Sequence, residues 1–152
     1  MSSLFDRIQS DLTRAIKGGE KERVGALRYV IAQIQYARKE KQAELTDEDV
    51  LEVLTRQARG RRESIEAFTS GERSDLVEKE SFELAIIETY LPEQLGADEI
   101  REVLQAIIAE EGLTGPAGMG QLMKAGMARL HGRADGKLVS ELAREELQRI
   151  AD

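Results

Sequence analysis

Apolar side chains recur every three to four residues along almost the whole chain, and this spacing constrains the fold more than any other feature. Leu4, Ile8 and Leu12 give the first example, followed by the stop signal Gly18-Gly19. Such spacing gathers apolar side chains on one face of an α-helix. No stretch alternates apolar and polar residues with a period of two, as a half-buried strand would. The sequence therefore predicts an all-α protein.

Start and stop signals divide this pattern into seven expected helices. A small polar residue before a periodic run indicates a start, acidic residues favour the first turn, and glycine or proline marks an end. Thr46 is the clearest cap, since three acidic residues follow it, and we expect Asp98 to cap the fifth helix. The expected helices cover residues 4–16, 21–41, 47–69, 75–90, 98–111, 119–130 and 137–150.

The stretch Leu91–Ala97, LPEQLGA, is the strongest candidate for a domain boundary. Pro92 ends the preceding helix, because a proline disfavours the helical conformation of the residue before it. Four expected helices precede this stretch and three follow it. The sequence therefore predicts an N-terminal four-helix domain, residues 1–92, and a small C-terminal three-helix domain, residues 96–152.

Composition excludes several kinds of chemistry. The chain has no cysteine, which excludes disulfides, thiolate zinc sites and cysteine nucleophiles. His131 is the only histidine, and a single histidine at the end of a helix is more typical of a capping or surface residue than of a catalytic base. Because there is no second histidine and no cysteine, metal binding is no better supported than catalysis. We therefore expect no catalytic residue, no metal site and no cofactor.

The charge pattern and the lack of long apolar runs bear on location and partners. The net charge is −7, with 15 basic and 19 acidic residues over positions 1–94 and 7 and 10 over positions 95–152. This even acidity argues against a broadly basic nucleic-acid-binding domain but leaves room for a local basic patch. Asp6, Arg7 and Asp11 interrupt the region where a signal peptide needs its apolar core, and no apolar run reaches the roughly 18 residues of a membrane span. We expect a soluble, cytoplasmic protein.

Polar side chains interrupt the apolar faces of the third and fourth helices. Glu80 and Glu83 fall within the apolar arc of the fourth helix, and Gln57 and Arg61 within that of the third. Because a lone buried charge is costly, we expect Arg61 to cluster with Glu80 and Glu83. Gln57 and, from the second helix, Arg28 are expected to join this buried polar network. Two carboxylates could serve acid–base chemistry or hold a metal. We favour the alternative, an ion-pair network that fixes helix register or an open groove, because no nucleophile or histidine lies nearby.

A basic stretch lies between the sixth and seventh expected helices. Residues 118–137 contain four cations and one acid inside an acidic chain. Amides at the start of the seventh helix favour an anion such as phosphate, and glycines in the turn would let a nucleic-acid backbone approach. The alternative is an ordinary interhelical turn with solvated cations. The candidate RNA-binding residues are Lys124, Arg129, Gly132, Arg133 and Lys137.

Three methionines, Met119, Met123 and Met127, recur every four residues in the sixth helix. Methionine stripes can form adaptable binding surfaces. The alternative, which we favour, is that they form the core face of this helix, with Gly126 allowing a neighbouring helix to approach closely.

Several stretches of the chain resemble the YqeY-like proteins. YLPEQL (Tyr90–Leu95), MGQLM (Met119–Met123) and GRADGK (Gly132–Lys137) carry the resemblance in the C-terminal part, and LTDEDV, RRESIEAF and GERSDLVEKESFEL carry it upstream. This family is related to the C-terminal tail of the GatB component of the glutamine-dependent Asp/Glu-tRNA amidotransferase, the GatB/YqeY domain. One departure is Gly118, where the family usually has an acidic residue or asparagine, so a weaker cap is expected on the sixth helix.

The resemblance implies a helical N-terminal domain, a three-helix C-terminal domain and a link to tRNA. In the amidotransferase the tail domain grips tRNA, while the reactions take place in other domains and subunits. We therefore expect a tRNA- or RNA-binding accessory module without a complete active site of its own, and a protein partner from the translation machinery. Many family members are described as carbon–nitrogen ligases with glutamine as amido-N-donor, an enzymatic alternative that these residues do not support independently. A protein–protein adaptor, which would bind a partner helix at the methionine stripe or at a groove of the fourth helix, is the other alternative.

Overall fold

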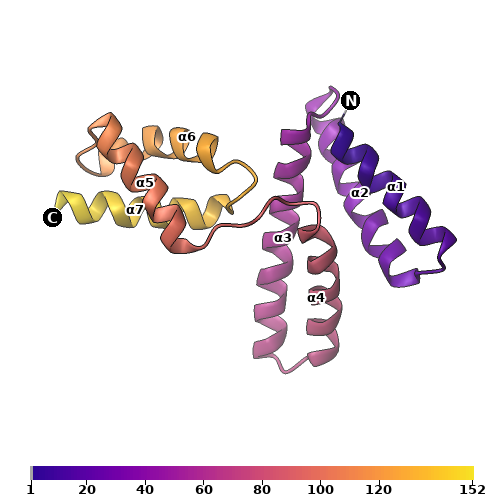
Figure 1. The fold of residues 1–152 in the computed structure, drawn as a ribbon. Coiled ribbons are helices and arrows are strands. Elements are labelled where there is room, and N and C mark those ends of the chain that lie inside the picture. The colour runs from indigo at the N-terminus through magenta and orange to yellow at the C-terminus, as the bar shows by residue number, and fades with distance from the viewer. Residues whose placement is uncertain (1) are drawn as a thin grey trace. The chain divides into compact units, whose positions relative to one another are not determined.

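The computed structural model describes residues 2–152, and this part of the chain contains seven α-helices, one short 3₁₀ turn and no strand (Figure 1). The all-α prediction is confirmed. The elements are α1 Ser3–Lys17, α2 Lys21–Lys41, α3 Asp47–Ser70, α4 Ser74–Glu88, α5 Ala97–Glu111, η1 Pro116–Gly118, α6 Met119–Leu130 and α7 Gly136–Ala151.

Of the two helix caps expected from the sequence, the structure confirms one and contradicts the other. Thr46 caps α3 as predicted: its hydroxyl accepts from the backbone N–H of Asp49 at 3.2 Å, and the Asp49 carboxylate accepts from the N–H of Thr46 at 2.9 Å. This reciprocal pair is a capping box. The prediction that Asp98 caps α5 is wrong, because the extended backbone of Gly96 already starts the helix. Asp98 lies in the first turn and accepts a 3.1 Å hydrogen bond from Arg101.

The described chain divides into two compact units, one ending at Pro92 and one beginning at Glu93. In the first unit, α1 pairs with α2 and α3 pairs with α4 (Figure 1). Several polar contacts join these hairpins. For example, the Asp47 carboxylate accepts from the N–H of Leu4 at 3.1 Å, and the Tyr90 hydroxyl donates to Asp11 at 2.5 Å. The core of this unit includes the fully buried Ile8, Leu27, Val50, Leu54 and Ile87.

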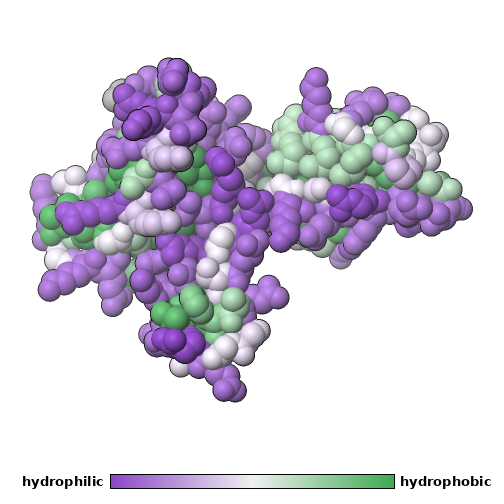
Figure 2. All heavy atoms as spheres, turned by 180° about the vertical axis from the view of Figure 1, so that it is seen from behind, coloured by the Kyte–Doolittle hydropathy of each residue, from purple (hydrophilic) through white to green (hydrophobic). Residues whose placement is uncertain are grey.

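The second unit packs α5, α6 and α7 around its own apolar cluster. Gly126 is buried here, and a Cβ at this position would lie 3.2 Å from the side chain of Leu104, so the glycine permits the close approach expected of it. Met119, Met123 and Met127 are half-buried and pack against this cluster, as the core interpretation requires. Part of the apolar surface stays visible on the face of this unit seen in Figure 2.

None of the helices within residues 2–152 combines the length and the apolar content that crossing a bilayer requires.

Candidate nucleic-acid interface

A five-residue turn, residues 131–135, joins α6 to α7 and carries a basic side chain at its tip. Gly132 has a φ of +72°, a left-handed conformation that favours glycine. The N–H of Arg133 then donates to the carbonyl of Leu130 at 2.8 Å, and Ala134 is buried under the turn. Glycine and a small apolar anchor therefore fold the chain back tightly and leave the Arg133 side chain exposed.

The segment that precedes α5 forms two hydrogen bonds with the backbone of this turn. The side-chain amide of Gln94 donates to the carbonyl of Gly132 at 2.8 Å, and the N–H of Leu95 donates to the carbonyl of Arg133 at 2.8 Å. The stretches YLPEQL and GRADGK, about 40 residues apart in the sequence, are thus in direct contact. These two hydrogen bonds hold the carbonyls of Gly132 and Arg133 in place, so the Arg133 side chain projects from a defined backbone.

The five candidate RNA-binding residues do not share one face. Gly132, Arg133 and Lys137 lie in or next to the turn, and Arg129 occupies the last turn of α6. Lys124 is exposed but lies five residues before Arg129, which corresponds to a rotation of about 140° around the helix axis. The structure therefore groups four of the five residues near the turn and separates Lys124 from Arg129.

Arg129 already has a partner within the unit. Its guanidinium donates to both carboxylate oxygens of Glu110 in α5, and both side chains are about half exposed. The hydrogen bond from Arg129 lowers the pKa of Glu110, and the same bond raises the pKa of Arg129. Exposed ion pairs contribute little stability, so a phosphate could compete for this guanidinium.

The start of α7 differs from the expectation. The helix begins at Gly136, and the Asp135 carboxylate caps it by accepting from the N–H of Lys137 at 3.3 Å. A carboxylate thus occupies the position in which a phosphate was expected. The cationic side chains, rather than the helix amides, are the groups that an anion would meet.

The polar residues of the first unit form a second cluster. Arg61 Nη1 lies 2.9 Å from Glu80 Oε2 and also contacts Glu83 Oε2, although the latter contact lacks hydrogen-bond geometry. The Arg61 guanidinium stacks over the ring of Tyr29, 5.0 Å from its centre. The structure thus joins α3 and α4 through a half-buried ion-pair cluster with an aromatic neighbour on α2.

Two residues expected in this cluster lie apart from it. Arg28 is exposed on α2, and Gln57 is half-buried on α3. Neither contributes a hydrogen bond or an ion pair to the cluster among residues 2–152. Tyr29, the neighbour of Arg28 in the sequence, takes the place expected for Arg28.

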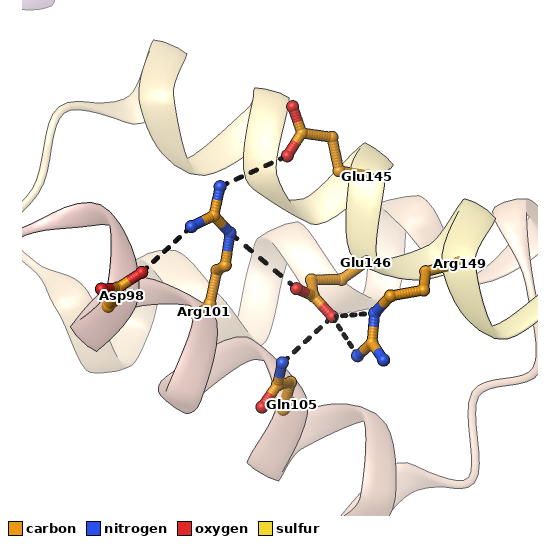
Figure 3. A network of polar contacts seen from close by, with 6 residues as sticks. All are labelled: Asp98, Arg101, Gln105, Glu145, Glu146 and Arg149. Carbon is orange, nitrogen blue, oxygen red and sulfur yellow. Dashed lines mark hydrogen bonds and ion pairs between the residues drawn. The ribbon is translucent and has the colours of Figure 1, made fainter.

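A buried carboxylate in α7, Glu146, was not predicted from the sequence (Figure 3). It accepts from Gln105 at 3.2 Å and from Arg149 Nε at 3.1 Å, and Arg101 lies 4.0 Å away. Burial raises the pKa of Glu146, but the hydrogen bonds and the two guanidinium charges outweigh it and hold the pKa below its usual value. The signal was present, because Glu146 follows Val139 by seven residues on the apolar face of α7.

Comparisons with known proteins agree with the sequence resemblance. A family model described as "Yqey-like protein" matches residues 5–147. The chain is 32% identical over 146 residues to a protein of Pyrenophora tritici-repentis named altered inheritance of mitochondria protein 41, mitochondrial, covering 93% of this chain and 80% of that protein. It is 35% identical over 86 residues to an uncharacterised protein of Schizosaccharomyces pombe, covering 57% of this chain and 70% of that protein.

A more distant match is to one component of a tRNA amidotransferase. The chain is 32% identical over 108 residues to the E component of the glutamyl-tRNA(Gln) amidotransferase of Thermococcus gammatolerans. The match covers 59% of this chain and 17% of that protein, so the similar region is a small part of the larger polypeptide.

Proposed function

Because the chain belongs to the YqeY-like family, we propose that it is an RNA-binding accessory module resembling the tail of the glutamine-dependent tRNA amidotransferase. The expected ligand is tRNA or another structured RNA. The observation that carries the proposal is the turn between α6 and α7, in which exposed Arg133 projects from a backbone that Gln94 and Leu95 hold in place, with exposed Lys137 next to it in the first turn of α7. Basic side chains on a defined backbone are what phosphate contacts require.

The proposed contact is local. Both halves of the chain are acidic, so a broad electrostatic attraction to RNA is absent and the turn has to supply the phosphate contacts. Arg129 joins Arg133 and Lys137 when phosphate displaces Glu110. Lys124 is expected to contribute least, because it lies on another side of α6.

The proposal is tested by fluorescence anisotropy with a labelled tRNA(Gln) transcript. We expect saturable binding that weakens about tenfold or more in Arg129→Ala/Arg133→Ala/Lys137→Ala, because this variant can no longer form the phosphate contacts. The matched control, Lys17→Ala/Lys21→Ala/Lys39→Ala, removes three exposed cations of the first unit and should bind like the wild type. If no saturable binding occurs even at low salt, the proposal fails.

We also propose that the two units are separate domains, four helices followed by three. Each unit has its own apolar cluster, which is what an independently folding domain needs. Residues 93–152 expressed alone should therefore unfold cooperatively in urea, and a non-cooperative transition would contradict this. Cytoplasmic location and a protein partner from the translation machinery stay predictions, and one relative is named as a mitochondrial protein.

A further inference from the structure

A groove opens in the first unit between α2, α3 and α4, away from the basic turn in the sequence. It encloses about 880 Å³. Arg61 of α3, a member of the ion-pair cluster described above, lines the groove. The other lining residues lie on one face of α2 and on one face of α4. These wall residues are Glu22, Gly25 and Tyr29 of α2, and Asp75, Glu78, Lys79, Phe82 and Glu83 of α4.

Two aromatic side chains that line this groove are partly exposed to solvent. Tyr29 is 48% exposed and Phe82 is 41% exposed, so both keep apolar surface in contact with water. Arg61 stacks on the ring of Tyr29 and is itself held by Glu80 and Glu83, which positions this aromatic ring. Positioned, half-exposed aromatic rings are typical anchors of protein-binding surfaces.

Gly25 keeps the groove open. Glycine inside a helix costs about 1 kcal/mol relative to alanine. A Cβ on Gly25 would meet no heavy atom within 4 Å, so packing within residues 2–152 does not require a glycine here. The missing side chain instead leaves room in the wall between Glu22 and Tyr29, where the backbone of another molecule could approach.

The charges of the groove determine what could fill it. The residues that line it include four acids and two cations, a net charge of −2. Arg61 is neutralised by its two glutamates, while Glu22 and Glu78 form no ion pair among residues 2–152. An acidic groove repels the phosphates of RNA and attracts lysine and arginine.

We propose that this groove binds a basic amphipathic helix of a partner protein. Apolar side chains of the partner pack against Tyr29 and Phe82, and its lysine or arginine side chains pair with Glu22 and Glu78. This mode places a helix with apolar residues three to four positions apart along the groove. The inference is independent of RNA binding by the turn.

The test is a selection of random 16-residue peptides displayed on phage against the full chain, followed by affinity measurements with the selected peptides. The expected peptides combine helically spaced apolar residues with lysine or arginine. They should bind at least tenfold more weakly to Glu22→Lys/Glu78→Lys and to Gly25→Leu, which fills the groove without changing charge. Glu52→Lys/Glu66→Lys, with the same charge change at exposed sites of α3, should bind them like the wild type.

Three outcomes would overturn the proposal. The first is that no peptide is enriched, or that the selected peptides are acidic. The second is that the selected peptides bind all variants equally. The third is self-association of the wild type in analytical ultracentrifugation that Glu22→Lys/Glu78→Lys abolishes, which would make a second copy of the chain the occupant. Far-UV circular dichroism verifies that each variant is folded, and Gly25→Leu should be at least as stable as the wild type.

Discussion

The backbone N–H of Leu95 donates a 2.8 Å hydrogen bond to the carbonyl of Arg133. This bond fixes the tip of the turn between α6 and α7 against the segment that precedes α5. Because its carbonyl accepts this hydrogen bond, the backbone of Arg133 is restricted, and its side chain extends from a Cα in a defined position. The function proposed above depends on this arrangement, because a mobile turn would lose entropy on binding RNA.

Gly132→Ala should destabilise the second unit by about 1 kcal/mol or more, because φ is +72° at this position and alanine is strained there. Urea unfolding measures the change. The matched control is Gly120→Ala in the first turn of α6, where an added Cβ meets no atom within 4 Å and φ is not positive. This control should be neutral or stabilising, and equal effects of the two variants would contradict the strained turn.

Glu110→Gln should strengthen RNA binding by a few-fold. The substitution weakens the charge-assisted pair with Arg129, so the guanidinium no longer has to leave a carboxylate before it meets a phosphate. Anisotropy with the labelled tRNA(Gln) transcript measures the affinity. Glu102→Gln, at an exposed position of α5, makes the same change in charge and serves as the control. If both variants gain equally, net charge rather than Arg129 is responsible.

Arg61→Met should destabilise the first unit by about 2–3 kcal/mol, because Glu80 and Glu83 then face each other without a cation. Both side chains are only about 15% exposed, so water screens them poorly. Arg61→Met/Glu80→Gln/Glu83→Gln removes all three charges and should recover most of the stability in urea unfolding. A single variant within about 0.5 kcal/mol of the wild type would show that the cluster contributes little.

Glu146→Gln should lower the free energy of unfolding at pH 7 by about 1–3 kcal/mol, the usual effect of removing hydrogen bonds to a charged group. The folded-state pKa of Glu146 lies below the usual 4.5, so its contribution is present above pH 4.5 and is lost as the pH falls through the folded-state value. Urea unfolding from pH 7 to pH 3 should therefore show a smaller decrease of stability in the variant. An unchanged pH dependence, equal to that of exposed Glu141→Gln, would contradict this assignment.

Helix periodicity predicted the fold well because it depends on local spacing. The ranges of α2 and α6 follow the expected ones, while α4 ends at Glu88, two residues before the expected end at Tyr90. There the Thr89 hydroxyl donates to the carbonyl of Ile86 at 2.7 Å, and Pro92 follows. Polar residues on apolar faces also predicted the partners of Arg61, since a buried charge needs an opposite charge.

The details of the candidate interface could not be predicted from the sequence. Arg129 pairs with Glu110 of another helix, 19 residues away in the sequence, and α5 and α6 lie between Leu95 and Arg133 along the chain. Such contacts depend on how the helices pack, which periodicity leaves open. Glu146, in contrast, could have been predicted, because it is a polar residue on the apolar face of α7, as Arg61 is on that of α3.

The salt dependence of tRNA binding tests the central claim most directly. The affinity for labelled tRNA(Gln) is measured from about 50 to about 300 mM KCl for the wild type and for Arg129→Ala/Arg133→Ala/Lys137→Ala. If these cations meet phosphates, the slope of log K against log salt should be steep in the wild type and shallower by about 2–3 in the variant. Equal slopes, or no binding of the wild type at the lowest salt concentration, would contradict an RNA interface at this turn.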